Sequence, residues 1–326
     1  MSVIPTNPIP DPVIGKVVAL GGGHGLTATL TALRRVAGRI TAVVTVGDDG
    51  GSSGRIRREL PVLPPGDLRM ALAALASADE WHQLVAEVLQ HRFGGVGALA
   101  GHSVGNLLLT GVTEVLHGDP VAALDAVGRV VGAVGRVLPM SLVPLEIAAA
   151  VSGIDPDHPS DRRRIRGQVA VATTPGRVES IELLPDDPPG CPQACAAIAD
   201  ADAVILGPGS WFSSVLPHLL VPDLRRSMET TKAKRFVSLN LAPEAGETDN
   251  FTLTELLTTF TAHAPNLRLD GVIADETAVE GTAGLEEACA EIGAELIVAD
   301  LGSERSVNAH DPDKYAAALR AALTTK

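Results

Sequence analysis

Apolar and polar positions alternate along this chain in blocks that predict strands and helices in turn. Short apolar runs are typical of buried strands, whereas apolar residues three and four apart are typical of helices. The predicted strands lie at residues 16–20, 40–46, 203–206, 236–239, 271–274 and 295–299. A helical pattern follows the first strand, from about residue 27 to residue 36. Such alternation indicates a parallel sheet with helices on both faces. We therefore expect an α/β fold with three layers around a Rossmann-like parallel sheet.

The middle of the chain departs from this alternation. Residues 67–132 have mostly helical spacing, with helices expected at 81–90 and 104–116. We interpret this stretch as a helical insertion in a single domain that spans residues 15–326. The proline-rich start, residues 1–14, lacks the pattern of a signal peptide and is expected to be a disordered tail.

A second change of character begins after the helical insertion. Proline, β-branched residues and two strand-like pieces, at 168–172 and 179–183, surround a turn at 174–177. These features predict a small β-containing lobe over residues 136–190, placed so that it can cover a ligand site.

A run of glycines ends the first predicted strand and opens the first predicted helix. Glycine has no Cβ, so its backbone can adopt a positive φ and a phosphate can approach it closely. The first N–H groups of a helix are unpaired and lie at the positive end of its dipole. A strand, a glycine turn and a helix start together predict a diphosphate site. Its candidate residues are Gly22, Gly23, His24, Gly25 and Leu26.

This turn does not match the standard nucleotide motifs. Counted from Gly21, the sixth position of the dinucleotide pattern is Leu26 rather than glycine, and no P-loop run occurs. An NAD-dependent Rossmann enzyme is therefore disfavoured. On the local sequence alone, a plain strand-to-helix turn stays open as the alternative.

Two acids follow the second predicted strand on a glycine-rich loop, where ligands bind in open α/β sheets. Asp48 and Asp49 admit three roles. They could hold a Mg²⁺ that bridges diphosphate oxygens, accept a hydrogen bond from a ribose hydroxyl, or satisfy loop N–H groups as an Asx turn does. Hydroxyls, a further acid and forked arginine donors nearby add candidates for the same ligand. They are Ser52, Ser53, Arg55, Asp67 and Arg69.

Residues 50–54 also match Gly-x-Ser-x-Gly, the nucleophile-elbow pattern. The elbow needs one sharp turn, whereas two acids precede Ser52, and no histidine base can be placed beside it from spacing. Hydrolase chemistry at Ser52 is therefore disfavoured. His102 and Asn106 are four residues apart, as on one helix face, and we expect them to support the site.

A second candidate ligand turn follows the apolar run at 203–206. Its residues are Gly207, Pro208, Gly209 and Ser210, and Ser210 could instead simply cap the next helix. Asn240, after the following strand, could contact a ribose, a sugar or a base, or serve as a turn residue. Turns that follow parallel strands emerge at one edge of the sheet, so we expect this turn beside the first.

Composition excludes several function classes. The chain has 326 residues, enough for a substantial core, and a net charge of −13, which disfavours nucleic acid as a partner. No apolar run reaches the roughly 18 residues that span a bilayer. The spacing of Cys191, Cys195 and Cys289 fits neither a disulfide framework nor a zinc site. A cytoplasmic setting is the simplest expectation.

Five motifs occur in an order that resembles a known family. They are Gly-Gly-Gly-His-Gly at 21–25, Asp-Asp-Gly-Gly-Ser-Ser-Gly-Arg at 48–55, Pro-Pro-Gly-Asp-Leu-Arg at 64–69, Gly-His-Ser-Val-Gly-Asn at 101–106 and Leu-Gly-Pro-Gly-Ser at 206–210. The chain is similar to the YvcK-like gluconeogenesis factors, which include CuvA of mycobacteria, and in turn to the 2-phospho-L-lactate transferases (CofD). The resemblance covers nearly the whole chain after about residue 15.

The resemblance implies a cytoplasmic protein that binds a UDP-sugar, notably UDP-N-acetylglucosamine. Such a protein would act without catalysis in carbon metabolism, peptidoglycan synthesis and cell shape, through an unidentified regulatory partner and with a homodimer as an option. The transferase branch, whose acids in the matching loop lie beside the reacting phosphate, implies the alternative of a Mg²⁺-dependent transferase acting on a nucleotide-linked substrate. Related proteins often read His-Asp-Thr near His310, whereas Pro312 stands here, so that hydroxyl cannot be phosphorylated.

Overall fold

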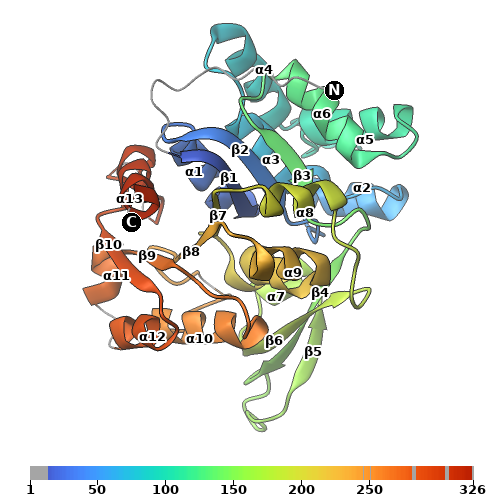
Figure 1. Cartoon of the computed structure of the whole chain (residues 1–326). Helices are drawn as coiled ribbons and strands as arrows, with labels where there is room; N and C mark the ends of the chain where they lie inside the picture. Colours follow the sequence, from blue (N-terminus) through green and yellow to red (C-terminus); the bar gives the residue numbers. More distant parts are fainter. Residues whose placement is uncertain (1–13, 245, 250, 281–283, 305–307, 325–326) are drawn as a thin grey trace.

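The computed structural model describes residues 14–244, 246–249, 251–280, 284–304 and 308–324. Within them the central feature is a parallel sheet of seven strands in the order β10-β9-β8-β7-β1-β2-β3 (Figure 1). The strands are β1 Ile14–Gly21, β2 Ala37–Val44, β3 Arg136–Pro139, β7 Ala203–Leu206, β8 Lys234–Ser238, β9 Gly271–Asp275 and β10 Glu295–Ala299. The expected α/β fold is confirmed. The expected tail lies outside the described residues, except for Ile14, which begins β1.

Helices cover both faces of this sheet and complete three layers (Figure 1). Helix α1 packs against α3 and α13, and α8 packs against α9. The helices of the main body are α1 Gly23–Leu33, α2 Gly51–Glu59, α3 Pro65–Ala74, α4 Glu80–Gln90, α5 Val104–Val115, α6 Pro120–Val130, α8 Pro192–Ala199, α9 Pro222–Thr230, α10 Leu253–His263, α11 Glu276–Glu280, α12 Leu285–Glu291 and α13 Pro312–Thr324. A π-helical turn, η1 Trp211–Val215, and a 3₁₀ helix, η2 Leu216–Leu220, follow β7.

The order of the strands reverses next to β1. The chain passes from β1 through β2 to β3, returns to place β7 on the other side of β1, and then continues outward to β10. Strands β1 and β7 are hydrogen-bonded neighbours, with Leu20 opposite Leu206. Both are fully buried at these positions, which explains their continuous apolar pattern. The carboxyl ends of β1 and β7 therefore flank a topological switch point, where open α/β sheets bind ligands.

The predicted helices are present, and the residues at their ends determine where each helix begins. Helix α4 begins after Asp79, whose side chain accepts a hydrogen bond from the His82 backbone N–H at 3.2 Å. Helix α5 spans Val104–Val115, within the predicted range. Helix α1 begins at Gly23 rather than near residue 27, because the glycine turn itself forms its first turn.

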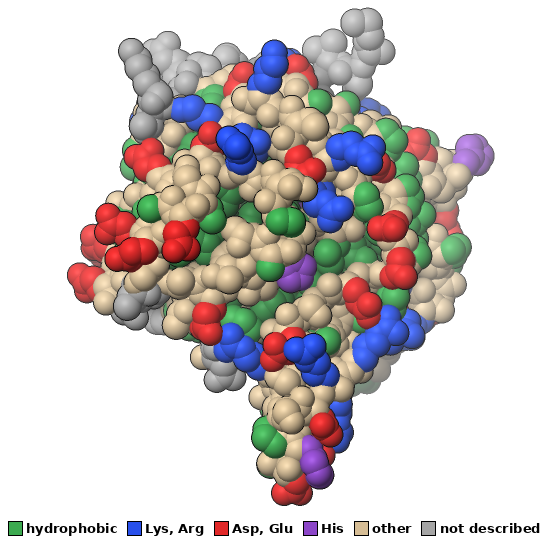
Figure 2. Space-filling model, turned by 60° about the horizontal axis from the view of Figure 1, so that its bottom comes forward, with side chains coloured by type: hydrophobic (Ala, Val, Ile, Leu, Met, Phe, Trp, Pro, Cys, Tyr) green, Lys and Arg blue, Asp and Glu red, His purple; other side chains and the backbone are tan. Residues whose placement is uncertain are grey.

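A second, antiparallel sheet of three strands, in the order β5-β4-β6, forms the small lobe (Figure 1). Its strands are β4 Glu146–Ser152, β5 Arg163–Arg166 and β6 Arg177–Leu184. The lobe projects from the main body with acidic and basic side chains interspersed on its surface (Figure 2). Strand β3, which we expected in the lobe, pairs with β2 in the main sheet.

The predicted strand at 168–172 is wrong, because these residues form a short helix, α7 Gln168–Ala172. Gly167 has a φ of 97°, a conformation open to glycine, and it redirects the chain after β5. The Asp49 carboxylate then accepts a hydrogen bond from the Val169 backbone N–H at 3.1 Å. Five residues, four of them apolar, are too few for periodicity to distinguish a helix from a strand.

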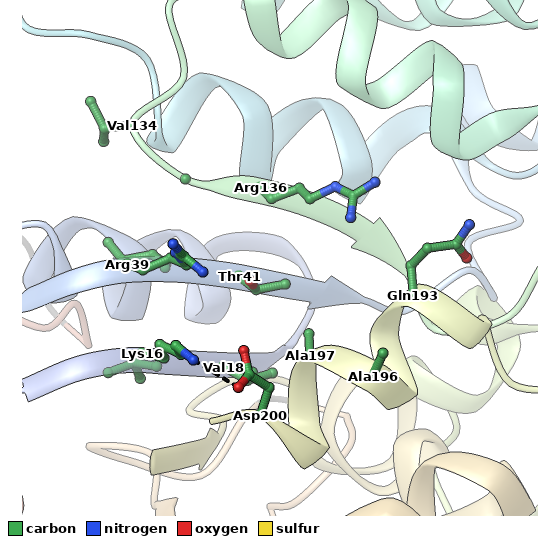
Figure 3. Close-up of a pocket in the computed structure, with 13 residues that line it drawn as sticks. Lys16, Val18, Arg39, Thr41, Val134, Arg136, Gln193, Ala196, Ala197 and Asp200 are labelled. Atoms are coloured by element: carbon green, nitrogen blue, oxygen red, sulfur yellow. Dashed lines mark hydrogen bonds and ion pairs between the residues drawn. The ribbon is translucent and has the colours of Figure 1, made fainter. Parts of the chain in front are cut away.

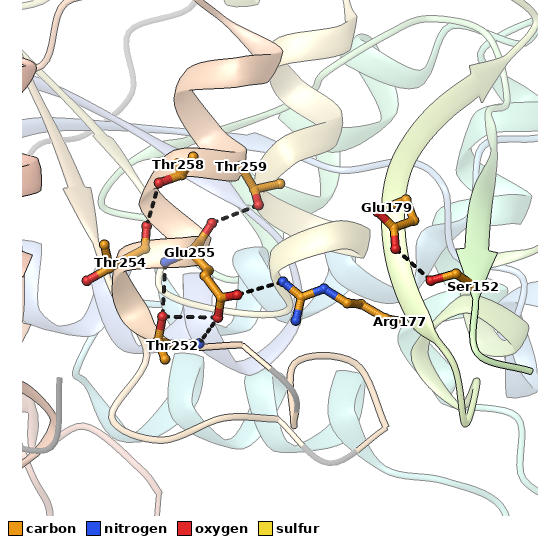
Figure 4. Close-up of polar contacts among 8 residues, drawn as sticks. All are labelled: Ser152, Arg177, Glu179, Thr252, Thr254, Glu255, Thr258 and Thr259. Carbon is orange, nitrogen blue, oxygen red and sulfur yellow. Dashed lines mark hydrogen bonds and ion pairs between the residues drawn. The ribbon is translucent and has the colours of Figure 1, made fainter. Parts of the chain in front are cut away.

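A cluster around Arg177 joins the lobe to the main body (Figure 4). Arg177, the first residue of β6, donates to Glu255 of α10 at 2.8 Å, and its guanidinium lies 4.0 Å from the centre of the Phe251 ring. Glu255 also forms a capping box with Thr252 at the start of α10. The start of β6 is therefore tied to the start of α10.

Candidate functional site

The two glycine turns that follow β1 and β7 are in direct contact. A Cβ built on Gly25 would lie 2.1 Å from the Pro208 carbonyl oxygen and 2.6 Å from the Gly209 Cα. A Cβ on Gly209, whose φ is 135°, would lie 3.6 Å from the Gly25 Cα. The expected placement of both turns at one edge of the sheet is therefore what the structure shows. The side chain of Leu26 is buried and its N–H bonds to the Gly22 carbonyl at 3.2 Å, so neither is free for a ligand.

Asn240 holds the second turn in place. Its Oδ1 accepts a hydrogen bond from the Gly209 N–H at 2.8 Å, and its Nδ2 donates to the Gly209 carbonyl at 3.1 Å. Thr29 of α1 donates to the Gly207 carbonyl at 2.9 Å. The amide of Asn240 thus positions the turn. Because both its oxygen and its nitrogen bond to Gly209, few of its hydrogen-bonding positions are left for a ribose, sugar or base.

Two glutamates that the sequence analysis missed stand beside this turn. Ser210 does not cap η1; its hydroxyl donates to Glu244 at 2.7 Å. Glu247 caps η1 instead, because its Oε1 accepts from the N–H groups of Phe212 at 2.9 Å and Ser213 at 3.0 Å. Burial and then the neighbouring Glu244 raise the pKa of Glu247. The sequence of the loop after β8 has no local pattern that would have predicted a role for Glu244 and Glu247 at this turn.

Asp48 and Asp67 lie close together next to the first turn. A Cβ on Gly22 would be 2.4 Å from Asp67 Oδ2, and a Cβ on Gly66 would be 2.6 Å from Asp48 Oδ2. Burial and the negative charge of Asp48 raise the pKa of Asp67 to about 7, whereas the Gly23 N–H and Arg69 act against the rise. The start of α1 therefore already faces a carboxyl group, which exchanges its proton near neutral pH.

Asp49 has a different role from Asp48, although the sequence treated them alike. Its carboxylate caps the start of α7, as described above, and thereby joins the lobe to the loop after β2. Asp48 accepts a hydrogen bond from the Gly50 N–H at 2.9 Å, as in an Asx turn, but its second oxygen lies toward Gly66. Of the two acids, Asp48 is the one that lies beside Asp67.

A chain of hydrogen bonds connects α3, α5 and α2 behind these acids. Arg69 is buried and donates to Asn106 Oδ1 at 2.9 Å, and Asn106 Nδ2 donates to Ser52 Oγ at 3.0 Å. Ser52 Oγ lies 2.9 Å from His102 Nδ1. Burial and then Arg55 lower the pKa of His102, which favours the neutral ring. The neutral ring can accept a hydrogen bond from the Ser52 hydroxyl. The spacing of residues in the sequence did not predict this contact between His102 and Ser52.

These hydrogen bonds hold the side chains of Arg69, Asn106 and Ser52 in place, so the side chains are not free to bind a ligand. His102 precedes α5 instead of sharing a helix face with Asn106, because α5 begins at Val104. Burial lowers the pKa of Arg69 to about 10, so the residue stays cationic near Asp67 and Asp48 at neutral pH. The single Asn106 amide links Arg69 and Ser52. Both residues are thereby held in fixed orientations.

Among the remaining predicted residues, some already have hydrogen-bond partners within the protein and others are accessible to a ligand. Ser53 Oγ accepts from the Gly66 N–H at 3.0 Å, and Arg55 Nη2 donates to the Ala100 carbonyl at 2.7 Å. His24 is exposed in the first turn of α1. Gly23 has a φ of 55° and space around it, since the nearest atom to an added Cβ is Asp67 Oδ1 at 4.0 Å. His24 and Gly23 thus present the open surface of the turn.

The acids fit a divalent cation only together with a ligand. Carboxylate oxygens are the donors that Mg²⁺ prefers, and protein sites commonly supply one or two of them beside substrate phosphates. Within the described ranges, no group of three or more His, Cys, Asp or Glu side chains could hold a metal ion. Asp48 and Asp67 would therefore hold an ion that phosphate oxygens also coordinate.

Comparison with known proteins identifies the family of this chain. The model of the 2-phospho-L-lactate transferase family, CofD, matches residues 17–310. The chain belongs to the CofD family. The putative gluconeogenesis factor of Mycobacterium tuberculosis is 54% identical over 306 residues, which make up 93% of this chain and 89% of that protein. The resemblance inferred from the five motifs is thereby confirmed.

More distant relatives also match nearly the whole chain. The gluconeogenesis factor of Listeria innocua is 33% identical over 322 residues, which cover 95% of this chain and 96% of the other. A crystal structure of a member of the UPF0052 family from Bacillus halodurans superposes with a TM-score of 0.83 at 31% identity, covering 94% of this chain and 99% of that one. The overall fold is thus shared with the Bacillus halodurans protein.

Proposed function

We propose that this protein binds a UDP-sugar, with UDP-N-acetylglucosamine as the expected ligand, and acts as a non-catalytic metabolic factor. The observation that carries the proposal is the contact between the turns at Gly25 and Pro208, next to the switch point between β1 and β7. The N-terminal turn of α1, where the Gly23 N–H already bonds to Asp67, would offer its remaining unpaired N–H groups to a diphosphate. The relatives named gluconeogenesis factors support a role in carbon metabolism. Roles in peptidoglycan synthesis and cell shape rest on the family resemblance.

The second candidate function is a Mg²⁺-dependent transferase that acts on a nucleotide-linked substrate. The pair formed by Asp48 and Asp67 favours it, because both acids stand beside the turn that would hold the diphosphate. The cation would neutralise phosphate charge there. A direct transfer to an acceptor needs no protein nucleophile, so the buried Ser52, held by Asn106 and His102, bears on hydrolase chemistry and not on this candidate.

The other parts of the proposal rest on the resemblance. These are the regulatory protein partner, the homodimer and the cytoplasmic location. Within the part of the chain that the structure describes, no helix has the length and apolar character needed to cross a bilayer.

Ligand binding is tested by thermal unfolding with millimolar UDP-N-acetylglucosamine, UDP-glucose, GDP, NAD and NADP. We expect UDP-N-acetylglucosamine to raise the melting temperature most. A ligand at 100 times its dissociation constant adds roughly 2.7 kcal/mol to the free energy of unfolding. No shift with either UDP-sugar, alongside a clear shift with NAD, would contradict the proposal.

Turnover distinguishes the two candidate functions. Incubation of the protein with UDP-N-acetylglucosamine, Mg²⁺ and small phosphorylated acceptors, followed by chromatography of the nucleotides, should leave the nucleotide intact. Asp48→Asn should then change only the affinity for the nucleotide or the effect of Mg²⁺ on that affinity. Consumption that requires Mg²⁺ and disappears in Asp48→Asn, but persists in Asp49→Asn, would establish the transferase instead.

A further inference from the structure

A groove with a cavity volume of about 590 Å³ lies between strands β1 to β3 and helix α8 (Figure 3). Pockets that hold small molecules commonly have volumes of roughly 300–1,000 Å³. Small apolar side chains of β1, β2 and α8 form part of its wall. The charged side chains that line it are Lys16, Arg39, Arg136 and Asp200. The groove thus carries more positive than negative charge, in a chain whose net charge is −13.

The three cations stand on adjacent strands. Lys16 of β1 is opposite Arg39 of β2 in the parallel register, and Arg136 of β3 is opposite Thr41 of β2. Arg39 and Thr41 are two residues apart, so their side chains lie on the same face of the sheet. Like charges at directly opposite positions of a sheet are destabilising unless something neutralises them.

Two of these cations form hydrogen-bonded ion pairs with acids, whereas Arg39 acts on Asp200 only through its charge, which adds to the larger effect of Lys16 in lowering the pKa of that carboxyl. Lys16 Nζ lies 2.7 Å from Asp200 Oδ1, and Arg136 forms a fork with Asp125 at 2.9 and 2.7 Å. Arg39 is exposed and its guanidinium makes no hydrogen bond or ion pair with any described residue. The Thr41 hydroxyl and the Gln193 amide add neutral hydrogen-bonding groups to the same groove.

We propose that this groove is a second binding site and that it takes a small anionic metabolite, a phosphate monoester or a polycarboxylate. The unpaired, forked Arg39 guanidinium is suited to either anion. Lys16 can turn from Asp200 to the ligand, because the two side chains of that pair are 42% and 66% exposed and such surface pairs are weak. The apolar wall would contact the carbon skeleton of the metabolite.

The groove is separate from the candidate nucleotide site. Lys16, Arg39 and Arg136 stand near the amino ends of their strands, whereas the glycine turn and Asp48 follow the carboxyl ends. Gly21 lies five positions after Lys16, which corresponds to roughly 16 Å of strand. The proposal therefore does not depend on the identity of the nucleotide.

The test measures dissociation constants calorimetrically for inorganic phosphate, glycerol 3-phosphate and citrate, at an ionic strength held constant with NaCl. Arg39→Gln should weaken binding of the preferred anion about tenfold, since it removes a charge-assisted contact. Asp200→Asn should tighten it, because Lys16 loses its competing acid. Arg320→Gln removes an exposed arginine on α13, outside the groove, and should change nothing.

The pattern over the three variants decides the outcome. Loss in Arg39→Gln with a gain in Asp200→Asn supports the groove, and the relative affinities for glycerol 3-phosphate and citrate identify the anion class. Wild-type affinity in Arg39→Gln would place the anion elsewhere and overturn the proposal. An equal loss in Arg320→Gln, or no binding of any of the three anions at 10 mM (roughly the weak limit of specific binding), would overturn it as well.

Discussion

Gly25→Ala is expected to destabilise the fold and to weaken nucleotide binding more than tenfold at the same time. The new Cβ would lie 2.1 Å from the Pro208 oxygen and 2.6 Å from the Gly209 Cα, which are backbone atoms that cannot rotate away. Overpacking of this kind costs about 1–3 kcal/mol, and relief would require α1 to move away from the second turn. Chemical denaturation should show the loss of stability, and calorimetry should show an affinity for UDP-N-acetylglucosamine reduced more than tenfold.

Gly111→Ala is the matched control for this substitution. Gly111 lies inside α5, and apart from the neighbouring backbone of that helix no atom lies within 4 Å of an added Cβ. Alanine there should stabilise the helix by about 0.5–1 kcal/mol, because glycine is the poorer helix former. Wild-type stability and affinity in Gly25→Ala would contradict the close contact between the two turns.

Asp67→Asn is expected to remove a large pH dependence of stability. The folded protein holds the Asp67 proton up to a pKa of about 7, whereas the unfolded chain releases it near 4. The native state therefore binds more protons between these values, and its stability falls as the pH rises from about 4 to about 7. The full shift corresponds to about 4 kcal/mol as an upper limit, since Asp67 is only partly buried. Denaturation of wild type and Asp67→Asn at pH 4 and pH 8 measures the difference.

Mg²⁺ provides a second measurement on the same residue. An ion held by Asp48, Asp67 and the phosphates of bound UDP-N-acetylglucosamine would favour the charged carboxylate, so 10 mM Mg²⁺ (roughly enough to fill a weak two-carboxylate site) added together with the nucleotide should stabilise wild type at pH 8 more than at pH 5. The effect should vanish in Asp67→Asn and persist in Asp49→Asn, because Asp49 caps α7. Identical pH dependence in wild type and Asp67→Asn would show that Asp67 is not held as a protonated acid.

The sequence located the elements that local patterns specify. The apolar runs that became β1, β2 and β7 are buried on both faces of a parallel sheet, so they read as continuous hydrophobic stretches. Both glycine turns were recognisable because a positive φ or a close backbone approach demands glycine. The pattern failed at α7, where five residues fit either period and Gly167 with its capping acid, Asp49, decided the outcome.

Only the tertiary structure decided which side chains meet. His102 reaches Ser52 across 50 residues of sequence, and Glu247 caps η1 from 35 residues away from Phe212. Asp67 faces Asp48 because α3 begins beside the loop that follows β2, whereas neighbouring Asp49 turns to the lobe. The periodicity of apolar residues in the sequence indicates whether a residue is buried. The partner of a buried polar group depends instead on which loops the strand order brings together at one edge of the sheet. The register of three strands likewise gathers Lys16, Arg39 and Arg136 into one groove.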